Sequence, residues 1–315
     1  MTTPRGNRAA RAAFAAAAAS GTLHHAWLLA GPEGVGKASF AREAATDLLA
    51  QAAGDPTTAR TRALIDAGSH PDYRVLERLP RDAKPDSGLA RSITIAQVRA
   101  LQPLFATTPS LGPRRVVLID AVDDLERAGA NALLKNLEEP PAGTLFFLVS
   151  HAPGRLLPTI RSRCRLLRFE PLDAADMRAA LADALPEANA PELDALVRVG
   201  AGSPGRALRF AGLDLDQIDT ALGTIAKGGD PDNAERVKLM RALSLKAAQP
   251  RYEAFLERVP TFLAEQAPYR HGEALRTALD AYDEARGIAA SARALSLDAG
   301  GTVFELAGVV ARLAR

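Results

Sequence analysis

A short glycine-rich segment between an apolar run and a helical pattern constrains this chain more than any other feature. Residues 31–37 read GPEGVGK; they follow the apolar run Trp27–Ala30 and precede a helical pattern over Ala38–Gln51. A strand-to-helix turn with the spacing Gly-x-x-x-x-Gly-Lys is typical of phosphate-binding loops, in which backbone N–H groups, the helix N-terminus and the lysine converge on phosphate oxygens. We therefore interpret four residues of the turn as phosphate-binding: Gly31, Gly34, Gly36 and Lys37. The alternative is a glycine-rich turn with an incidental lysine.

The residues that such a loop needs for magnesium and for water activation are incomplete. Ala38 follows the lysine where the motif has a hydroxyl that holds magnesium, and Ser39 comes one residue too late because a helix turns about 100° per residue. Asp120 ends the apolar run Val116–Asp120, where Walker-B acids coordinate magnesium; a helix cap is the alternative. The next residue is Ala121 rather than a second acid. We therefore expect ATP and magnesium to bind weakly and hydrolysis to be negligible.

Further apolar runs follow the loop in the order expected for a parallel sheet covered by helices. Val116–Asp120 and Leu145–Ser150 are apolar throughout and end in a polar residue, which is typical of strands buried on both faces. Helical spacing recurs before and after the first of them, at Ile95, Val98, Leu101, Leu104 and Phe105 and at Leu125, Ala128, Ala132, Leu133 and Leu137. The pattern predicts an α/β domain over residues 1–170, with the polar segment Leu79–Gly88 as an exposed loop.

The chain changes character after about Asp173. Strand signals disappear, and alanine, leucine and arginine dominate. Glycine and proline breaks separate the helical patterns, at Pro186, Gly202–Gly205, Gly228–Pro231 and Pro250. The pattern predicts two all-helical units, a small one over residues 171–212 and a larger one over residues 213–315 that includes the amphipathic stretch Ala274–Leu295.

One cysteine and a near-neutral charge narrow the classes of function. Cys164 alone allows neither an internal disulfide nor a four-thiolate zinc site and is typical of a reducing compartment, so we expect a cytoplasmic protein. The formal charge of +2 does not indicate a dedicated DNA-binding surface, and no segment reaches the roughly 20 strongly apolar residues of a membrane span. Arg5, Arg8 and Arg11 before Ala12–Ala19 superficially resemble a signal peptide; because alanine is weakly hydrophobic, we expect an alanine-rich first helix.

Several strings of residues resemble bacterial clamp-loader subunits of the AAA+ class. The most specific are residues 130–141 (ANALLKNLEEPP) and 156–164 (LLPTIRSRC), and shorter matches lie at residues 25–37, 69–73 and 202–208. The resemblance implies that the three units predicted above are, in chain order, a RecA-like AAA+ parallel-sheet domain, a small helical lid and an all-helical collar for oligomerisation. It also implies a hetero-pentamer with gamma or tau and delta subunits of DNA polymerase III, which places a sliding clamp on primed DNA.

Within this family the chain resembles the delta-prime type, which usually lacks competent hydrolysis. The likeness rests on Ala38, Ala121 and the spacing from the phosphate loop to Ser69–Tyr73. Family members often carry a four-cysteine zinc module before the last of these, but Gln51–Arg62 contains no cysteine, so we expect no zinc and no other metal. Two alternatives stay open: a gamma- or tau-type ATP-hydrolysing motor, and a freestanding P-loop enzyme. Whether the chain is itself an enzyme is left open with them.

The resemblance assigns one residue a catalytic role. Arg163, in a Ser-Arg-Cys string, is expected to act as an arginine finger in trans on ATP held by a neighbouring subunit. The alternative is a structural ion pair beside Arg161 and Arg165. Cys164 is expected to be a small buried hydrophobe, because no histidine–acid pair is evident near it.

Sensor positions of the family give two further interpretations. Arg206 lies in the second-sensor string, where it either reaches a bound nucleotide or caps the preceding helix. His151 follows the run Leu145–Ser150 where related ATPases sense the γ-phosphate, with a simple strand terminator as the alternative. Asp123 and Asp124 are explained equally well as caps at the start of the next helix.

Overall fold

A computed structural model of the chain describes residues 5–21, 23–81 and 89–314 and forms two compact units. Unit 1 comprises Met1–Ala180 and Gly202–Gly205, and unit 2 comprises Leu181–Ala201 and Arg206–Arg315. The short segment Gly202–Gly205 therefore packs with unit 1 although it lies between helices of unit 2. The predicted division at residues 170 and 212 is finer than these two units and stays a prediction.

Five parallel strands form the centre of unit 1, in the order β2-β3-β4-β1-β5. The strands are β1 (Ala26–Ala30), β2 (Tyr73–Glu77), β3 (Arg115–Asp120), β4 (Thr144–Ser150) and β5 (Arg165–Arg168). Three of them, β1, β3 and β4, are the predicted apolar runs to within a residue. The parallel sheet, with the glycine-rich loop directly after its first strand, confirms the predicted RecA-like α/β fold class.

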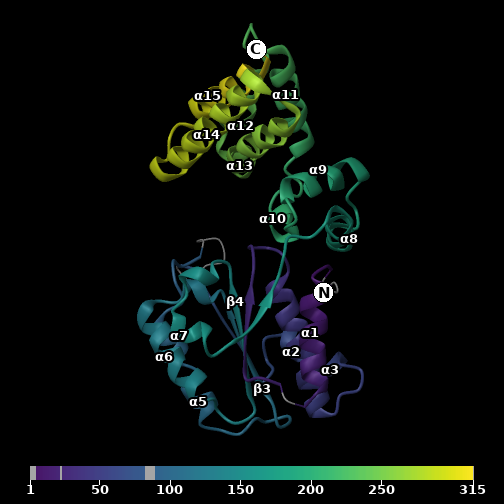
Figure 1. Ribbon diagram of the computed structural model, residues 1–315, viewed down its shortest axis with the longest axis vertical. Coiled ribbons are helices and arrows are strands. Elements are labelled where there is room, and N and C mark those ends of the chain that lie inside the picture. The colour runs from purple at the N-terminus through teal and green to yellow at the C-terminus, as the bar shows by residue number, and fades with distance from the viewer. Residues whose placement is uncertain (1–4, 22, 82–88, 315) are drawn as a thin grey trace. The chain divides into compact units, whose positions relative to one another are not determined.

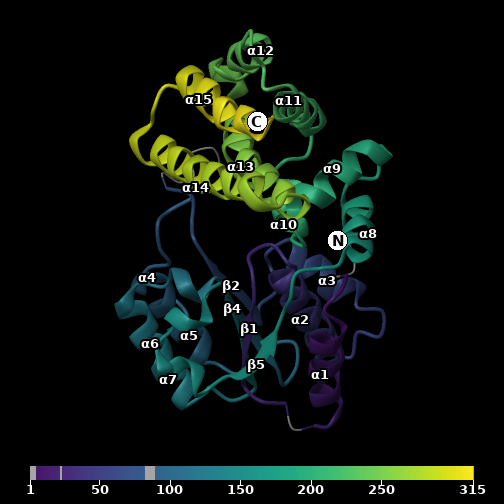
Figure 2. The same cartoon turned by 45° about the horizontal axis from the view of Figure 1, so that its top comes forward.

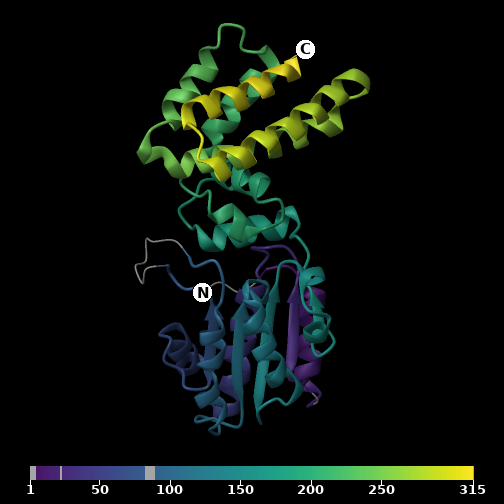
Figure 3. The same cartoon turned by 90° about the vertical axis from the view of Figure 1, so that its left-hand side faces the viewer.

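Helices cover both faces of this sheet (Figures 1 and 3). The helices of unit 1 are α1 (Arg8–Ala19), α2 (Lys37–Ala53), α3 (Ala59–Asp66), α4 (Ile95–Arg99), α5 (Gln102–Phe105), α6 (Arg127–Glu138) and α7 (Pro158–Arg161). Neighbouring residues of β4 point to opposite faces: the Phe147 ring contacts Phe14 of α1 and Phe40 of α2, whereas the Phe146 ring contacts Phe105 of α5. The predicted alanine-rich first helix is confirmed as α1, and its Phe14 is buried in the core.

The two edge strands were missed by the sequence analysis. Strand β2 buries only Tyr73 and Leu76, and β5 buries only Leu167. Edge strands carry polar and charged side chains because one side lacks a neighbouring strand, so they lack the continuous apolar run by which central strands are found.

One predicted helix is divided into two. The apolar spacing from Ile95 to Phe105 forms α4 and α5, which are separated at Ala100 and Leu101. Pro103 lies in the first turn of α5, where its missing N–H leaves no hydrogen bond unmade. A capping box of Thr94 and Gln97 starts α4, so both short helices have defined beginnings.

Unit 2 is helical throughout, as predicted (Figure 2). Its helices are α9 (Ala190–Gly200), α11 (Leu215–Gly228), α12 (Ala234–Leu243), α13 (Gln249–Gln266), α14 (Gly272–Leu295) and α15 (Ala299–Ala311), while α8 (Ala174–Ala184) and α10 (Pro204–Leu208) lie partly in each unit. Helix α14 packs on α13 and α15 through a stripe of buried alanines, namely Ala278, Ala281, Ala285, Ala289 and Ala292. Small side chains at this spacing let helices approach closely.

A buried guanidinium ties two helices of unit 2 together. Arg258 of α13 is 2% exposed; its Nη2 donates to Asp219 of α11 at 3.1 Å and to Glu265 at 2.8 Å. Because both carboxylates accept from it, the buried charge of Arg258 is paired.

Some sequence expectations concern the periphery of unit 1. Leu79 and Leu89 are exposed at the ends of the predicted loop Leu79–Gly88, and Pro80 bridges to Leu89, while residues 82–88 of that prediction lie outside the described residues. Among the described helices, none is both long and apolar enough to cross a membrane.

Candidate functional site

The phosphate loop lies between β1 and α2 and takes a conformation that needs glycine. Gly34 and Gly36 have φ angles of +77° and +93°, in the left-handed region that L side chains rarely adopt. A Cβ on Gly31 would lie 2.1 Å from the carbonyl oxygen of Phe169, the residue after β5. Gly36 is the N-cap of α2, so the loop delivers the N-terminus of a 17-residue helix to the site.

Lys37 is folded back into its own loop. Its side chain is 2% exposed, and its Nζ donates to the carbonyl oxygen of Gly31 at 2.6 Å and to that of Pro32. Burial lowers the pKa of Lys37 to about 8, against the opposing attraction of Asp120, Asp123 and Glu33. The ammonium group must therefore exchange these carbonyls for phosphate oxygens before it can bind a nucleotide.

The structure, like the sequence, provides an incomplete set of ligands for magnesium. Asp120 ends β3, and burial raises the pKa of its carboxyl, an effect that His151 and Lys37 partly oppose and Glu77 reinforces. Ala38 offers no hydroxyl. A raised carboxyl pKa and a missing hydroxyl do not fit a hard cation that prefers charged oxygen ligands, so we derive no step through magnesium.

Asp123 and Asp124 have structural partners. The Asp123 carboxylate accepts hydrogen bonds from Ser150 Oγ at 2.9 Å and from the backbone N–H of His151 at 2.7 Å and Ala152 at 3.2 Å. Asp124 pairs with Arg78 at 3.0 Å. Both acids lie in a short 3-10 helix, Val122–Asp124, rather than at the start of α6 as predicted. Asp123 fixes the loop after β4, so neither acid replaces the one that is absent at Ala121.

A string from far along the sequence covers the phosphate loop. Ser203 Oγ donates to the carbonyl oxygen of Glu33 at 2.8 Å, and the N–H of Gly205 donates to that of Gly34 at 2.9 Å. A Cβ on Gly205 would lie 2.8 Å from the Cα of Gly34. The sequence analysis named only Arg206 of this string as a site residue. Gly205, a residue that permits close approach of two backbone segments, was the signal from which the contact with the loop could have been predicted.

Arg206 points into unit 2. Its Nε lies 3.7 Å from the Glu257 carboxylate of α13, and its side chain is half-buried. The preceding helix, α9, ends at Gly200 with Ala201 as its C-cap residue, and Arg206 is the third residue of the next helix, α10. Its predicted part in nucleotide binding stays a prediction.

Arg163 lies at the surface of unit 1, just before β5. Its Nη2 pairs with the Glu138 carboxylate at 2.7 Å, and its Nη1 donates to the carbonyl oxygen of Thr159 at 2.9 Å and to Ser162 Oγ at 3.4 Å. The side chain stays 34% exposed. The structure thus contains an ion pair at Arg163, with Glu138 as its partner, and leaves the Arg163 side chain partly exposed.

Cys164 packs against apolar residues as expected, but it is only partly buried. It is partly buried against the core that lies under α6 and α7, and burial raises the pKa of its thiol to about 12. A thiol with this pKa is almost wholly protonated at neutral pH and is a poor nucleophile.

In the segment at which related chains carry a zinc module, this chain has a carboxylate that holds the loop by hydrogen bonds. Asp55 accepts hydrogen bonds from the N–H and the hydroxyl of Thr61, both at 3.0 Å, and so caps the start of α3. In the described part of the chain, no group of three or more His, Cys, Asp or Glu side chains is placed to hold a metal ion.

The string Ser69–Tyr73 holds a loop rather than a ligand. The Asp72 carboxylate is buried and accepts from the N–H groups of Ser110 and Leu111, both at 2.8 Å. His70 Nδ1 accepts from the N–H of Asp72 at 3.1 Å. These bonds fix the segment that leads into β3, and thereby the position of Asp120.

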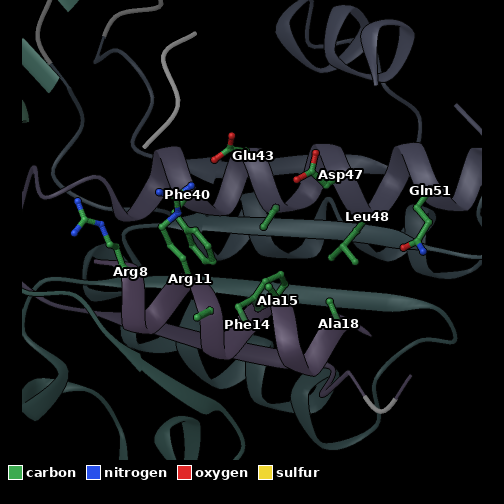
Figure 4. A pocket seen from close by; sticks show the side chains of 12 residues that line it. Arg8, Arg11, Phe14, Ala15, Ala18, Phe40, Glu43, Asp47, Leu48 and Gln51 are labelled. Carbon is green, nitrogen blue, oxygen red and sulfur yellow. The ribbon is translucent and has the colours of Figure 1, made fainter. Parts of the chain in front are cut away.

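A groove of about 560 Å³ lies apart from this loop, between α1 and α2 (Figure 4). Its floor is apolar, with Phe14, Phe40 and Leu48, and its rim carries Glu43 and Asp47. Burial raises the pKa of Asp47, which Arg62 opposes. The described lining contains no Ser, Cys, His or Lys.

Comparison with known proteins gives a consistent set of relatives. Residues 6–173 match the family described as DNA polymerase III, delta subunit. The DNA polymerase III subunit delta' of Pseudomonas aeruginosa is 42% identical over 191 residues, which cover 60% of this chain and 56% of that protein. Subunit delta' of Escherichia coli is 33% identical over 83% of this chain and 75% of that protein. Subunit tau of Escherichia coli is 32% identical over 78% of this chain and 37% of that protein.

Lengths and solved structures complete the comparison. The chain spans little more than half the length of the Pseudomonas relative. A solved gamma-subunit-related protein of Thermotoga maritima overlays 98% of this chain and 99% of its own, at 16% identity and a TM-score of 0.46.

Proposed function

The chain belongs to the DNA polymerase III delta-prime family, and from this premise we propose that it serves as a delta-prime-type subunit of the clamp loader. In that role it joins gamma or tau and delta subunits in a hetero-pentamer that loads the sliding clamp onto primed DNA. The proposed place of this work is the cytoplasm. The proposed division of labour follows the sequence prediction: an AAA+ domain over residues 1–170, a lid over residues 171–212 and a collar over residues 213–315 that holds the ring together.

One observation carries the proposal: the chain keeps an accessible arginine while its phosphate loop is bonded to itself. Arg163 is 34% exposed, whereas Lys37 is 2% exposed and bonded to Gly31 and Pro32. An arginine presented to a γ-phosphate neutralises charge that develops in the transition state, and such fingers contribute roughly 10³ to 10⁵ in rate. Arg163 thus acts in trans, on ATP that an adjacent gamma or tau subunit holds.

The phosphate loop is a vestigial or weak nucleotide site in this proposal. Gly31, Gly34 and Gly36 preserve the turn, and Lys37 still ends it. Asp120 and Arg206 complete the set of residues that would face a nucleotide in a competent relative. The donors fit a phosphate group only after Lys37 leaves its carbonyl partners, and the magnesium ligands are incomplete.

A gamma- or tau-type motor is the first alternative, because the tau subunit of Escherichia coli is also a relative. A motor needs a hydroxyl after the loop lysine and a water-activating acid after the Walker-B aspartate. Ala38 and Ala121 occupy these places, and Asp123 is bonded to Ser150 and its neighbours. A freestanding P-loop enzyme is the second alternative; the delta-prime relatives disfavour it.

Reconstitution tests the proposal. The full chain is mixed with gamma or tau and delta subunits, and assembly, ATP hydrolysis and clamp loading are measured with primed DNA and clamp. We expect a hetero-pentamer whose ATPase needs this chain, and negligible turnover by the chain alone. Failure to assemble, or turnover by the isolated chain that Lys37→Ala abolishes, would contradict the proposal.

A further inference from the structure

The ion pair at Arg163 joins two strings that are 25 residues apart in the sequence. Glu138 is the last residue of α6, and Arg163 follows α7. Their side chains meet at 2.7 Å, with Glu138 49% exposed and Arg163 34% exposed. An isolated exposed pair contributes little to stability, because water screens the charges and two long side chains must be ordered. Stabilisation of the fold therefore does not explain why Glu138 and Arg163 form this ion pair.

The partners of Arg163 engage only one end of the guanidinium. Nη2 pairs with Glu138, and Nη1 donates to the Thr159 carbonyl oxygen and to Ser162 Oγ. Among the described residues, Nε of Arg163 has no hydrogen-bond partner. The group is thus held in one orientation and keeps a donor for a further anion, because a guanidinium carries five N–H donors in a fixed fork.

The position of Glu138 at the end of α6 does not stabilise its negative charge. A carboxylate at the C-terminal end of a helix faces the negative end of the helix dipole, where basic side chains are preferred. The next residue, Glu139, is also acidic and exposed, and among the described residues it forms no ion pair. Of two adjacent carboxylates, only Glu138 has a cation, and that cation is the predicted finger.

We propose that Glu138 is a positioning residue for Arg163, holding the guanidinium by Nη2 so that Nε and the surface-facing edge are presented to the neighbour's γ-phosphate. This inference rests on the proposed function. A free arginine loses its rotamer freedom when it binds phosphate, whereas one already ordered by Glu138 and Thr159 loses little. Glu138 itself stays on the guanidinium and does not touch the nucleotide.

Turnover by the assembled loader tests this role. Loaders are prepared with wild-type chain, Glu138→Gln, Glu138→Ala, Arg163→Ala and the double variant, with Glu139→Gln as the matched control. At saturating ATP with DNA and clamp, we expect kcat at the site served by Arg163 to fall roughly three- to tenfold for Glu138→Ala and less for Glu138→Gln. KM for ATP should stay unchanged. The double variant should be no slower than Arg163→Ala alone, and Glu139→Gln should match wild type.

A second measurement does not depend on turnover. In the full chain labelled with ¹⁵N-arginine, the heteronuclear NOE at Arg163 Nε reports fast motion of the side chain. We expect an ordered signal in wild type and Glu139→Gln and a mobile one in Glu138→Ala, with the melting temperature unchanged. An ordered Arg163 in Glu138→Ala would overturn the inference.

The outcomes separate the two claims. If Arg163→Ala slows the loader and Glu138→Ala does not, the inference fails while the proposed function stands. If Arg163→Ala changes nothing, the proposed function fails and the inference with it. If Glu139→Gln slows the loader as much as Glu138→Gln, the effect is one of local charge and the positioning role is wrong.

Discussion

The sequence predicts that two basic side chains of unit 1 contact phosphate groups, but in the structure one of them is enclosed and the other lies at the surface. Lys37 is enclosed by the loop it belongs to, bonded to Gly31 and Pro32, and covered further by hydrogen bonds from Ser203 and Gly205 to the same loop. Arg163 lies at the surface with its Nη atoms fixed and Nε available. A motif thus indicates which chemistry a residue type suits, while the hydrogen bonds of that residue in the structure determine whether it is available for this chemistry.

The largest effect that tests this contrast is expected from Arg163→Ala in the assembled loader. Loss of a finger should slow hydrolysis at the neighbour's site by roughly 10³ to 10⁵. Total ATPase should fall only in part, because other sites keep their own arginines, and clamp loading should fall further. Arg163→Lys should not restore it, because lysine offers a point charge where arginine offers a planar fork. Unchanged loading at matched assembly would show that the accessible arginine is merely structural.

The enclosure of Lys37 predicts a pH dependence of stability. Its pKa of about 8 lies below the ordinary value of 10.5, so between these values the unfolded chain binds more protons than the folded one. The free energy of unfolding should therefore rise with pH across this window, by up to about 3 kcal/mol. Denaturant unfolding of wild type and Lys37→Met at pH 7 to 9.5 measures the difference. A slope that survives in Lys37→Met would mean that other groups cause it, and Arg163→Ala should keep the wild-type slope.

The cover on the loop can be opened at one glycine. A methyl group at residue 205 would meet the Cα of Gly34 at 2.8 Å, so Gly205→Ala should destabilise the chain by about 1 to 3 kcal/mol. Gly154→Ala is the matched control, because nothing lies within 4 Å of its added Cβ. Equal unfolding free energies for the two variants would show that the contact between Gly205 and Gly34 is loose.

The smallest effect is expected from Lys37→Ala in the assembled loader. A lysine whose partners are its own loop carbonyls contributes nothing to a neighbour's site, so ATPase and clamp loading should stay within about twofold of wild type. Steady-state assays beside the Arg163→Ala loader make the comparison direct. A loss comparable to that of Arg163→Ala would mean that the loop holds a working nucleotide, and the contrast between the two residues would be wrong.

The central sheet was predictable from the sequence and its edges were not. β1, β3 and β4 are buried on both faces, so their apolar runs are unbroken and easily found. β2 and β5 lie at the edges, where exposed positions carry charged residues and break the pattern.

The site shows the same limit in another form. Gly31 to Lys37 could be found because the loop's chemistry lies within seven consecutive residues. The partners of that loop and of Arg163 could not, because Ser203 is 170 positions from Glu33. Glu138 meets Arg163 only because α6 and α7 lie side by side at their ends, which no local pattern encodes.

The alanine stripe of α14 has a consequence for how this protein can change over time. Alanine is the smallest side chain that still favours a helix, so a larger residue at Ala281 or Ala285 would force α13 and α15 apart, and glycine would loosen the helix itself. Neither a larger residue nor glycine is tolerated on that face, while the opposite face of the same helix is free to vary. The buried positions of this stripe should therefore remain alanine for as long as the bundle is kept, and substitutions should accumulate at the exposed positions of α14.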